Sequence, residues 1–505
     1  METSCLRHTD LPQTSALFKD FLYHYHRVER FYTTAPATGY PEERRAAMVD
    51  ALRAQNSNQS ALDVLAKPGT VTVVTGQQVG LFSGPAYTIY KALTAARIAS
   101  DLTSRGKTAV PVFWLATEDH DWAEVNHAWV FDKSHKPRKL VAEPDRHGGI
   151  PVGNIRPVRW PLEELRQAIG DLPFGPETLQ LVTETHQEGR SMGEAFRALL
   201  ERLLKPLGFL FLDPLHPGVR QLAAPILRKA VALGPELNHL LLERNRELEH
   251  AGYHAQVHVD ARTSLFFFLQ HGKRIPLREL KLSTGELADQ AEHLSPNALL
   301  RPVVQDYMLP TAAYVGGPAE IAYFAQSQVL YDRLLGHMPR LVSRNGFTLI
   351  DSRSAKLLDR YKLALPDFFQ GEESLRERLA QSLVPAGLQE EFATATSNTA
   401  HTLELLRDKL LGFDPTLAAA LVKSRDKVLH QFRKSQGKVA RTILRRNEQA
   451  GSEALWLYHA LYPEKHLQER FYSIVPFLAQ HGLDLVDQLG EHVHVDCPDH
   501  MLLPI

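Results

Sequence analysis

The sequence is poor in cysteine, in net charge and in long apolar runs, and each absence excludes a class of protein. Cys5 and Cys497 are its only cysteines, too few for a disulfide framework, so we expect a reducing cytoplasmic setting. The formal net charge of -1 argues against a broad nucleic-acid-binding face. No run of about 18 apolar residues occurs, so no membrane span is expected. The segment Met1–Asp10 lacks the apolar core of a secretory signal.

The composition is that of an ordinary globular protein. Apolar residues make up 44% of the chain and charged residues 23%, which allows a sizeable core. A length of 505 residues favours two or three domains. More than one folding unit is therefore expected.

A glycine-rich segment follows the first strong strand signal. The β-branched run Val71–Val74 leads into Thr75–Pro85, and an amphipathic stretch comes next, which predicts a strand, a tight loop and a helix. A helix start can bind an anion or phosphate, although a plain turn between packed elements explains the glycines equally well. The loop matches neither the dinucleotide nor the Walker fingerprint. Its candidate binding residues are Gly76, Gln77, Gln78 and Gly80, with Tyr87 and Lys91 one turn apart on the helix.

A polar cluster follows the second buried strand, Ala109–Leu115. The segment Thr117–His127 contains Asp119, His120 and Asp121, our candidate catalytic residues, because a carboxylate beside a histidine can orient its ring for acid–base work. Loops at the carboxyl ends of parallel strands form ligand sites, so this segment should lie beside the glycine loop. Two alternatives stay open: a metal site of His120, Asp121 and His127, and a helix cap by Asp119 or Asp121.

Three more strands are expected at 208–212, 311–315 and 340–343. Five strand–turn–helix units predict an α/β fold with a doubly wound parallel sheet. Gly316 and Gly317 allow a ligand to approach the backbone, and Glu320 falls in the first turn of the next helix. Arg344 can bind phosphate or carboxylate with two hydrogen bonds, or it is simply a charge at a strand end.

Two insertions are expected in this core. Residues 131–185 are rich in Pro, Arg and Gly and predict irregular structure, whereas 235–305 contains a β-hairpin signal over 264–277. An N-terminal arm over 1–35 carries aromatic anchors and should pack on the core. The histidine pairs 254/258 and 492/494 suit strands, the second an edge strand at the C-terminus, better than metal sites, and we assign no metal ligand.

The character of the sequence changes near residue 372. Apolar residues recur at three–four spacing over 388–410 and again over 417–443, on either side of the turn Gly412–Pro415. This pattern predicts a long antiparallel coiled-coil hairpin whose apolar stripe a second copy would cover in a homodimer. The predicted units are a core over 1–370, the hairpin over 371–450, and a C-terminal segment over 451–505 that packs back on the core.

The motifs taken together resemble one family. The sequence is similar to the bacillithiol biosynthesis cysteine-adding enzymes, or cysteine ligases, over essentially its whole length. The matching stretches are Val74–Pro85, Tyr87–Lys91, Pro111–Asn126, Arg301–Pro302, Tyr314–Glu320 and the helical hairpin. The resemblance implies a Rossmann-like, nucleotide-binding core with connecting-peptide-like insertions and a dimerising coiled coil. It also implies a reaction that joins L-cysteine to the glucosamine amine of malyl-glucosamine, and it adds Asn126 to the candidate binding residues.

Amide formation from a free carboxylate needs activation, so ATP is the expected co-substrate. In this hypothesis the segment from Gly76 to Gly80 cradles phosphate or the amino acid, and His120 stabilises charge or moves the amine proton. Two other classes of function stay open. One is a nucleotidyltransferase-like enzyme acting on another small substrate, and the other is a non-catalytic dimeric scaffold whose core senses a ligand.

Overall fold

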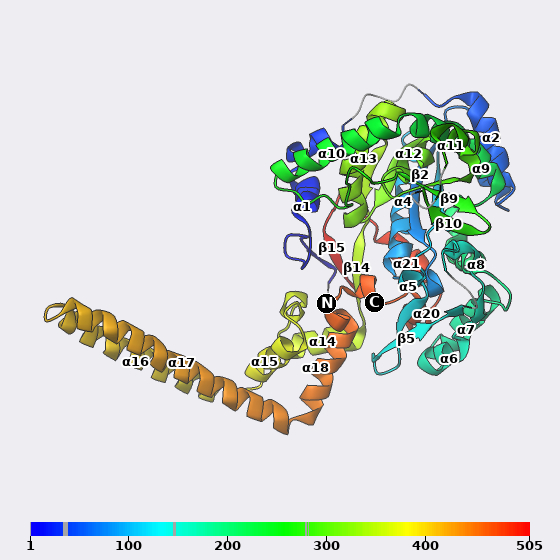
Figure 1. Ribbon diagram of the computed structural model, residues 1–505. Helices are drawn as coiled ribbons and strands as arrows, with labels where there is room; N and C mark the ends of the chain where they lie inside the picture. The colour runs from blue at the N-terminus through cyan, green and yellow to red at the C-terminus, as the bar shows by residue number, and fades with distance from the viewer. Residues whose placement is uncertain (1, 34–38, 145–147, 278–279, 281) are drawn as a thin grey trace.

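A computed structural model describes residues 2–33, 39–144, 148–277, 280 and 282–505. It shows a rounded α/β body, which holds both chain ends, and a long pair of helices that projects from it (Figure 1). Three predicted segments contain residues outside these ranges: the N-terminal arm (Met1 and 34–35), the first insertion (145–147) and the second insertion (278–279 and 281).

A five-stranded parallel sheet in the order β13-β12-β2-β3-β8 forms the centre of the body. The sequence predicts all five strands, and the doubly wound Rossmann-like arrangement is confirmed. The central strand β2 pairs along its whole length with β3. In this order the strands are Arg340–Ser343, Thr311–Gly316, Val71–Gln78, Ala109–Ala116 and Leu210–Leu212.

Each face of the sheet is covered by its own apolar core. Successive strand residues point to opposite faces, so Val73 joins the core on one face of the sheet whereas Val74 joins the core on the other face. Burial on both faces explains why these strands read as continuous apolar runs. The covering helices are α4 (Tyr87–Ser104) and α8 (Met192–Leu203) on one side, and α2 (Glu42–Arg53), α9 (Pro217–Ala232), α10 (Gly234–His250), α12 (Arg301–Met308) and α13 (Pro318–Leu334) on the other.

The glycine-rich segment differs from its prediction. Strand β2 continues through Gln78, so Gly76 is a strand residue, and a side chain there would meet the Trp114 carbonyl oxygen at 2.8 Å. A 3₁₀ turn, η3 (Leu81–Ser83), follows, and Gly84 takes a positive φ of 64°. Helix α4 begins only at Tyr87, and the Ala86 N–H before it donates to the Tyr472 carbonyl. The glycines therefore serve close packing, because pairing with β3 extends the strand beyond the predicted loop.

The first insertion is more regular than predicted. Two hairpins, β4 (His127–Phe131) with β5 (Pro137–Val141) and β6 (Glu143–Pro144) with β7 (Pro157–Arg159), lead to helices α6 (Leu162–Ile169) and α7 (Gly175–Thr185). The prediction of irregular structure was wrong because these helices bury apolar faces against the main core, as Leu165 and Val182 show.

The second insertion contains the predicted hairpin. Strand β9 (Phe266–Gln270) pairs with β10 (Lys273–Pro276), and β11 (Leu294–Pro296) adds a third strand. The prediction of a strand around His254 and His258 was wrong: these residues are described, and they form no strand. The Gln326 side chain instead bonds both the N–H and the carbonyl of Val257, in the place of a neighbouring strand.

A second sheet joins the two ends of the chain. Strand β15 (His500–Pro504) lies between β1 (Ser4–Leu6) and β14 (Gly346–Ile350). The fifth parallel strand, β13, is thus followed by strand β14 before helix α14 (Ser352–Tyr361) begins, and Asp351 caps that helix at its start. The predicted edge strand at His492 and His494 was wrong too, because β15 starts after them and is paired on both sides. The N-terminal arm packs on the body through buried aromatic rings, including Phe18 and Phe31.

The predicted helical hairpin is confirmed. Helices α16 (Ala386–Leu411) and α17 (Pro415–Arg446) run antiparallel and extend from a base of α15 (Glu372–Ser382) and α18 (Glu448–Leu461) (Figure 1). Among the described residues, no helix is both long enough and apolar enough to cross a membrane.

Candidate active site

A cavity of about 580 Å³ opens at the carboxyl ends of β2, β3 and β12. The strand order reverses between β2 and β12, and α/β sheets bind ligands at such switch points. Among the residues that line it are Lys91 and four arginines, against the three carboxylates of Glu118, Asp119 and Glu320. Five cations against three anions leave a formal charge of +2 on the wall, in a chain whose net charge is -1. The cavity therefore favours anionic ligands.

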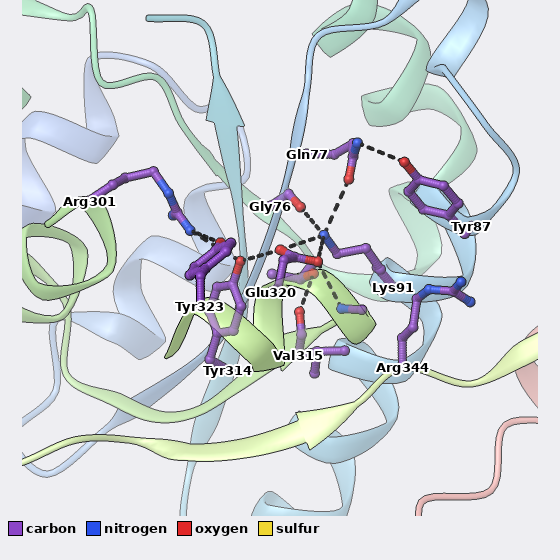
Figure 2. Close-up of polar contacts among 12 residues, drawn as sticks. Gly76, Gln77, Tyr87, Lys91, Arg301, Tyr314, Val315, Glu320, Tyr323 and Arg344 are labelled. Carbon is purple, nitrogen blue, oxygen red and sulfur yellow. Dashed lines mark hydrogen bonds and ion pairs between the residues drawn. The ribbon is translucent and has the colours of Figure 1, made fainter. Parts of the chain in front are cut away.

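A buried ion pair stands at the centre of the cavity wall (Figure 2). The Lys91 ammonium donates to both Glu320 carboxylate oxygens, at 2.9 and 2.7 Å, and to the carbonyl oxygen of Gly76. Glu320 also accepts the Gly317 N–H at 2.8 Å and the Tyr314 hydroxyl at 2.7 Å. This pair joins helix α4, the end of β2 and the start of α13, so it fixes three motif segments relative to one another.

Burial and the partner charge act on the pKa values of this pair in opposite directions. Burial lowers the pKa of Lys91, although the Glu320 carboxylate opposes this. Burial alone would raise the pKa of Glu320, but Lys91 and the Gly317 N–H together hold it below its usual value. Each group makes hydrogen bonds to the charged form of the other, which favours the ion pair although Lys91 is only 1% exposed.

An aromatic and arginine wall lies beside this pair. The Arg301 guanidinium donates to the Tyr323 hydroxyl at 2.9 Å (Figure 2). It also donates to the Gln305 side chain at 3.1 Å. Its Cζ atom lies 5.7 Å from the centre of the Trp114 ring. These contacts orient the guanidinium at the edge of the cavity.

His120 is held by an arginine and not by a carboxylate. The Arg274 Nη1 atom lies 3.2 Å from His120 Nδ1, whereas the nearest Asp119 oxygen is 3.8 Å away. A guanidinium only donates, so Nδ1 must accept and the ring proton of neutral His120 is assigned to Nε2. The predicted Asp–His pairing is therefore not the observed geometry, because β10 brings Arg274 to Nδ1 of the His120 ring, with its guanidinium 3.9 Å from the centre of the Phe267 ring.

Asp119 instead connects the two main motifs. Its Oδ2 accepts a hydrogen bond of 2.6 Å from the Gln78 side chain, and its Oδ1 accepts the His120 N–H at 2.7 Å. The neighbouring Glu118 is buried and forms an ion pair with Arg220. The prediction that the glycine-rich and acidic segments face one cavity is thus confirmed for Gln77, Gln78 and His120.

Arg344 lines the cavity, but its guanidinium already has a partner. Both of its terminal nitrogens bond the Glu469 carboxylate, one of them at 2.9 Å, and the two side chains are 6% and 3% exposed. The two hydrogen bonds expected for a ligand are therefore made within the protein. Its guanidinium also lies 5.0 Å from the centre of the Tyr87 ring (Figure 2).

Four predicted site residues lie outside this cavity. Gly80 lines a second, adjoining cavity, and Gly316 is buried in the strand end, where its carbonyl accepts the Arg344 N–H. Asp121 is exposed at the start of the short helix α5 (Trp122–Val125), without a side-chain cap bond. Asn126 contacts the His127 ring instead. The turn after β3 carries Asp121 and Asn126 away from the sheet end.

Several cavity residues were not predicted as site residues. Arg301 and Tyr314 belong to matching stretches of the sequence and could have been chosen for that reason. Arg274 and Arg470 could not, because their places depend on how β10 and α19 (Gln468–Phe471) pack on the sheet. No group of three or more His, Cys, Asp or Glu is placed to hold a metal ion within the described ranges.

Comparison with known proteins identifies the two parts of the chain. The family model "Bacillithiol biosynthesis BshC, N-terminal Rossmann-like domain" matches residues 1–345, and "Bacillithiol biosynthesis BshC, C-terminal coiled-coil domain" matches residues 347–505. Relatives in Solibacter usitatus and Koribacter versatilis are 50% and 36% identical, each over 100% of both chains. A relative in Salinibacter ruber is 29% identical over 97% of this chain and 96% of its own. All three carry the name "Putative cysteine ligase BshC".

Proposed function

The chain belongs to the bacillithiol biosynthesis BshC family, and from this premise we propose that it is a cysteine ligase. In our proposal it forms an amide bond between L-cysteine and the glucosamine amine of malyl-glucosamine, giving bacillithiol, and it works in the cytoplasm. The observation that carries the proposal is the convergence of three motif segments, around Gln78, Asp119 and Glu320, on one cation-rich cavity. Its charge suits a substrate that carries the carboxylates of a malyl group.

His120 acts as a hydrogen-bond donor in this proposal. Because Arg274 occupies Nδ1, the Nε2 proton is the one that His120 offers to the oxygen of the cysteine carboxyl group. A donor placed there stabilises the negative charge that develops when the amine attacks the carbonyl carbon. The Asp119 carboxylate, 30% exposed, accepts a hydrogen bond from the amine and receives the proton that nitrogen loses.

ATP is the activating co-substrate that we propose. The cysteine carboxylate attacks phosphorus, and a P–O bond of ATP breaks: transfer of the phosphoryl group releases ADP, and transfer of the adenylyl group releases pyrophosphate. Either transfer turns a carboxylate oxygen into a leaving group. The amine nitrogen then forms the C–N bond to the carbonyl carbon. The bond between this carbon and the oxygen that carries phosphorus breaks, and phosphate or AMP departs. The excess of cations on the wall fits phosphate groups. The start of α4 does not offer the Ala86 N–H to phosphate, because Tyr472 accepts it, so side chains must supply the donors.

We also propose that the protein is a homodimer joined by the hairpin. All of α16 is described and none of its residues is buried, and α17 buries only Ala418 and Ala440. Large apolar side chains stay exposed along the hairpin, including Leu405 at 53% and Phe413 at 81%. A second hairpin packed against this stripe would cover it.

One assay tests the reaction. Purified protein is incubated with malyl-glucosamine, L-cysteine and ATP, and mass spectrometry follows the sugar and the nucleotide. We expect a product equal to the two substrates less one water, formed together with AMP or ADP. Omission of ATP, and replacement of cysteine by serine, serve as controls. Product formation without any nucleotide would refute the role of ATP, and absence of product under all conditions would refute the ligase.

A further inference from the structure

Two cavities meet at one arginine. The cavity at the sheet switch point adjoins a second one of about 570 Å³, and both are lined by Gln77, Gln78, Tyr87 and Arg470. Glu124, Trp129 and Glu464 also line the second cavity. A ligand group at the junction would be in reach of both spaces.

Arg470 differs from the other cations of the main cavity. Lys91 is bound to Glu320 and Arg344 to Glu469, while Arg274 and Arg301 donate to protein oxygens at about 3.0 Å. For the Arg470 guanidinium, the described part of the chain supplies neither a hydrogen bond nor an ion pair. It is exposed and lies over the Tyr87 ring, with its Cζ 5.7 Å from the ring centre.

The position of Arg470 is nevertheless well defined by its neighbours. Glu469, the residue before it, is buried in the bond to Arg344, and Phe471, the residue after it, stacks on Trp129 with ring centres 4.6 Å apart. Both neighbours are anchored in the protein, so Arg470 is directed to the cavity by the short helix that carries all three. The fold thus holds in place a guanidinium for which the described residues provide neither a hydrogen-bond nor an ion-pair partner.

A second donor is available on the same wall. The Tyr87 hydroxyl oxygen accepts a hydrogen bond of 3.3 Å from Gln77, which leaves its own hydrogen to donate. Within the described residues no acceptor for that hydrogen is found. An arginine fork and a hydroxyl beside it are donors suited to a carboxylate or a phosphate.

We propose that Arg470 is a substrate-binding residue that holds an oxyanion at the junction of the two cavities, with the Tyr87 hydroxyl as its companion donor. The oxyanion is a carboxylate or a phosphate, and its source rests on the function proposed above: the malyl group of the acceptor or the phosphates of ATP. In either case the ligand reaches from one cavity toward the other, which brings the two reactants to the shared wall.

Calorimetry on the full-length protein tests this assignment. Wild type, Arg470→Gln, Arg470→Lys and Tyr87→Phe are titrated with malyl-glucosamine, with glucosamine, which lacks the malyl carboxylates, and with ATP. Arg105→Gln changes an exposed arginine far from both cavities and is the matched control. We expect Arg470→Gln to weaken binding of one anionic ligand about 10- to 100-fold, with a smaller loss in Arg470→Lys, and to leave glucosamine unaffected.

The outcomes separate the sources of the oxyanion. A loss confined to malyl-glucosamine identifies the carboxylate, and a loss confined to ATP identifies the phosphate. Equal affinities of wild type and Arg470→Gln for both ligands, within about twofold, would overturn the proposal, as would a wild type that binds neither. Titration with malate and with inorganic phosphate measures the anion site without any reaction, so its result stands even if the ligase assay fails.

Discussion

The α/β body and the helical hairpin differ in how many of their residues the chain itself buries. Helix α13 of the body buries ten of its 17 residues, whereas α16 of the hairpin buries none of its 26. The ion pairs differ in the same way: Arg344–Glu469 in the body is almost fully buried, and Arg441–Glu377 beside the hairpin is about half exposed on both sides. The body buries its apolar faces within the chain, with buried charges that position a site, and the hairpin leaves large apolar side chains exposed.

The largest difference should appear when one charge of each pair is removed. Glu469→Gln leaves the Arg344 guanidinium buried without its counter-charge, and we expect the free energy of unfolding to fall by about 3–5 kcal/mol. Glu377→Gln removes an exposed partner and should change it by less than about 0.5 kcal/mol. Urea unfolding followed by circular dichroism measures both. Similar losses in the two variants would remove the distinction between body and hairpin.

A substitution in the cavity of the body should reduce activity far more than a substitution of an exposed hairpin residue. We expect His120→Ala to reduce kcat/KM of cysteine addition by about 100-fold or more, since it removes the donor that we propose for the reacting oxygen. His401→Ala on the hairpin is the matched control and should stay within about twofold of wild type. Melting temperatures check that both variants are folded. Unchanged turnover in folded His120→Ala would end the assignment of that residue.

Acid should destabilise the body through a buried histidine. His186 is packed between Phe82 and Trp160, and burial lowers its pKa to about 4 from the ordinary 6.5. Between these values the unfolded chain binds a proton that the folded chain does not, so this contribution to stability is complete above pH 6.5 and falls as the pH drops toward 4.

From pH 6.5 to pH 5 this proton alone should remove about 1.6 kcal/mol of the free energy of unfolding. Unfolding measured at both pH values in wild type and in His186→Gln isolates the effect, because other histidines are common to the two proteins. An identical pH dependence in the two would show that His186 is not held neutral in the folded state.

Substitutions on the hairpin should act mainly on the oligomeric state of the protein. If its exposed stripe is a dimer surface, Leu406→Asp with Val428→Asp should weaken the dimer about 10-fold or more, because each charge would be buried against an apolar partner. Light scattering coupled to gel filtration gives the molar mass over a concentration series. Leu455→Asp, on the exposed side of α18, is the control. A wild type at the mass of one chain throughout would refute the dimer.

The sequence alone allows a large part of the body to be predicted, for a physical reason. Strands buried on both faces read as apolar runs, so Val71–Val74 and Ala109–Leu115 could be found, and their polar ends mark the site. Lys91 and Glu320 were both chosen as site residues, although their direct contact was not foreseen. That contact spans 229 residues of sequence and depends on the strand order, which no local pattern specifies.

The parts that could not be predicted depend on tertiary packing. Arg274 reaches His120 across 154 residues, from a hairpin in an insertion, and Arg470 is directed by buried neighbours on a four-residue helix. Gly80 was expected in the site because the strand was expected to end at Val74. Pairing with β3 carries it on to Gln78, so Gly80 falls beyond the cavity.

The central claim is that the chemistry belongs to the sheet switch point and not to the hairpin. Hydrogen–deuterium exchange with and without malyl-glucosamine and cysteine tests it most directly. We expect slower exchange in the segments around Gln78, His120 and Gly317, and no change along 390–440. Protection confined to the hairpin, with none at these three strand ends, would contradict the account.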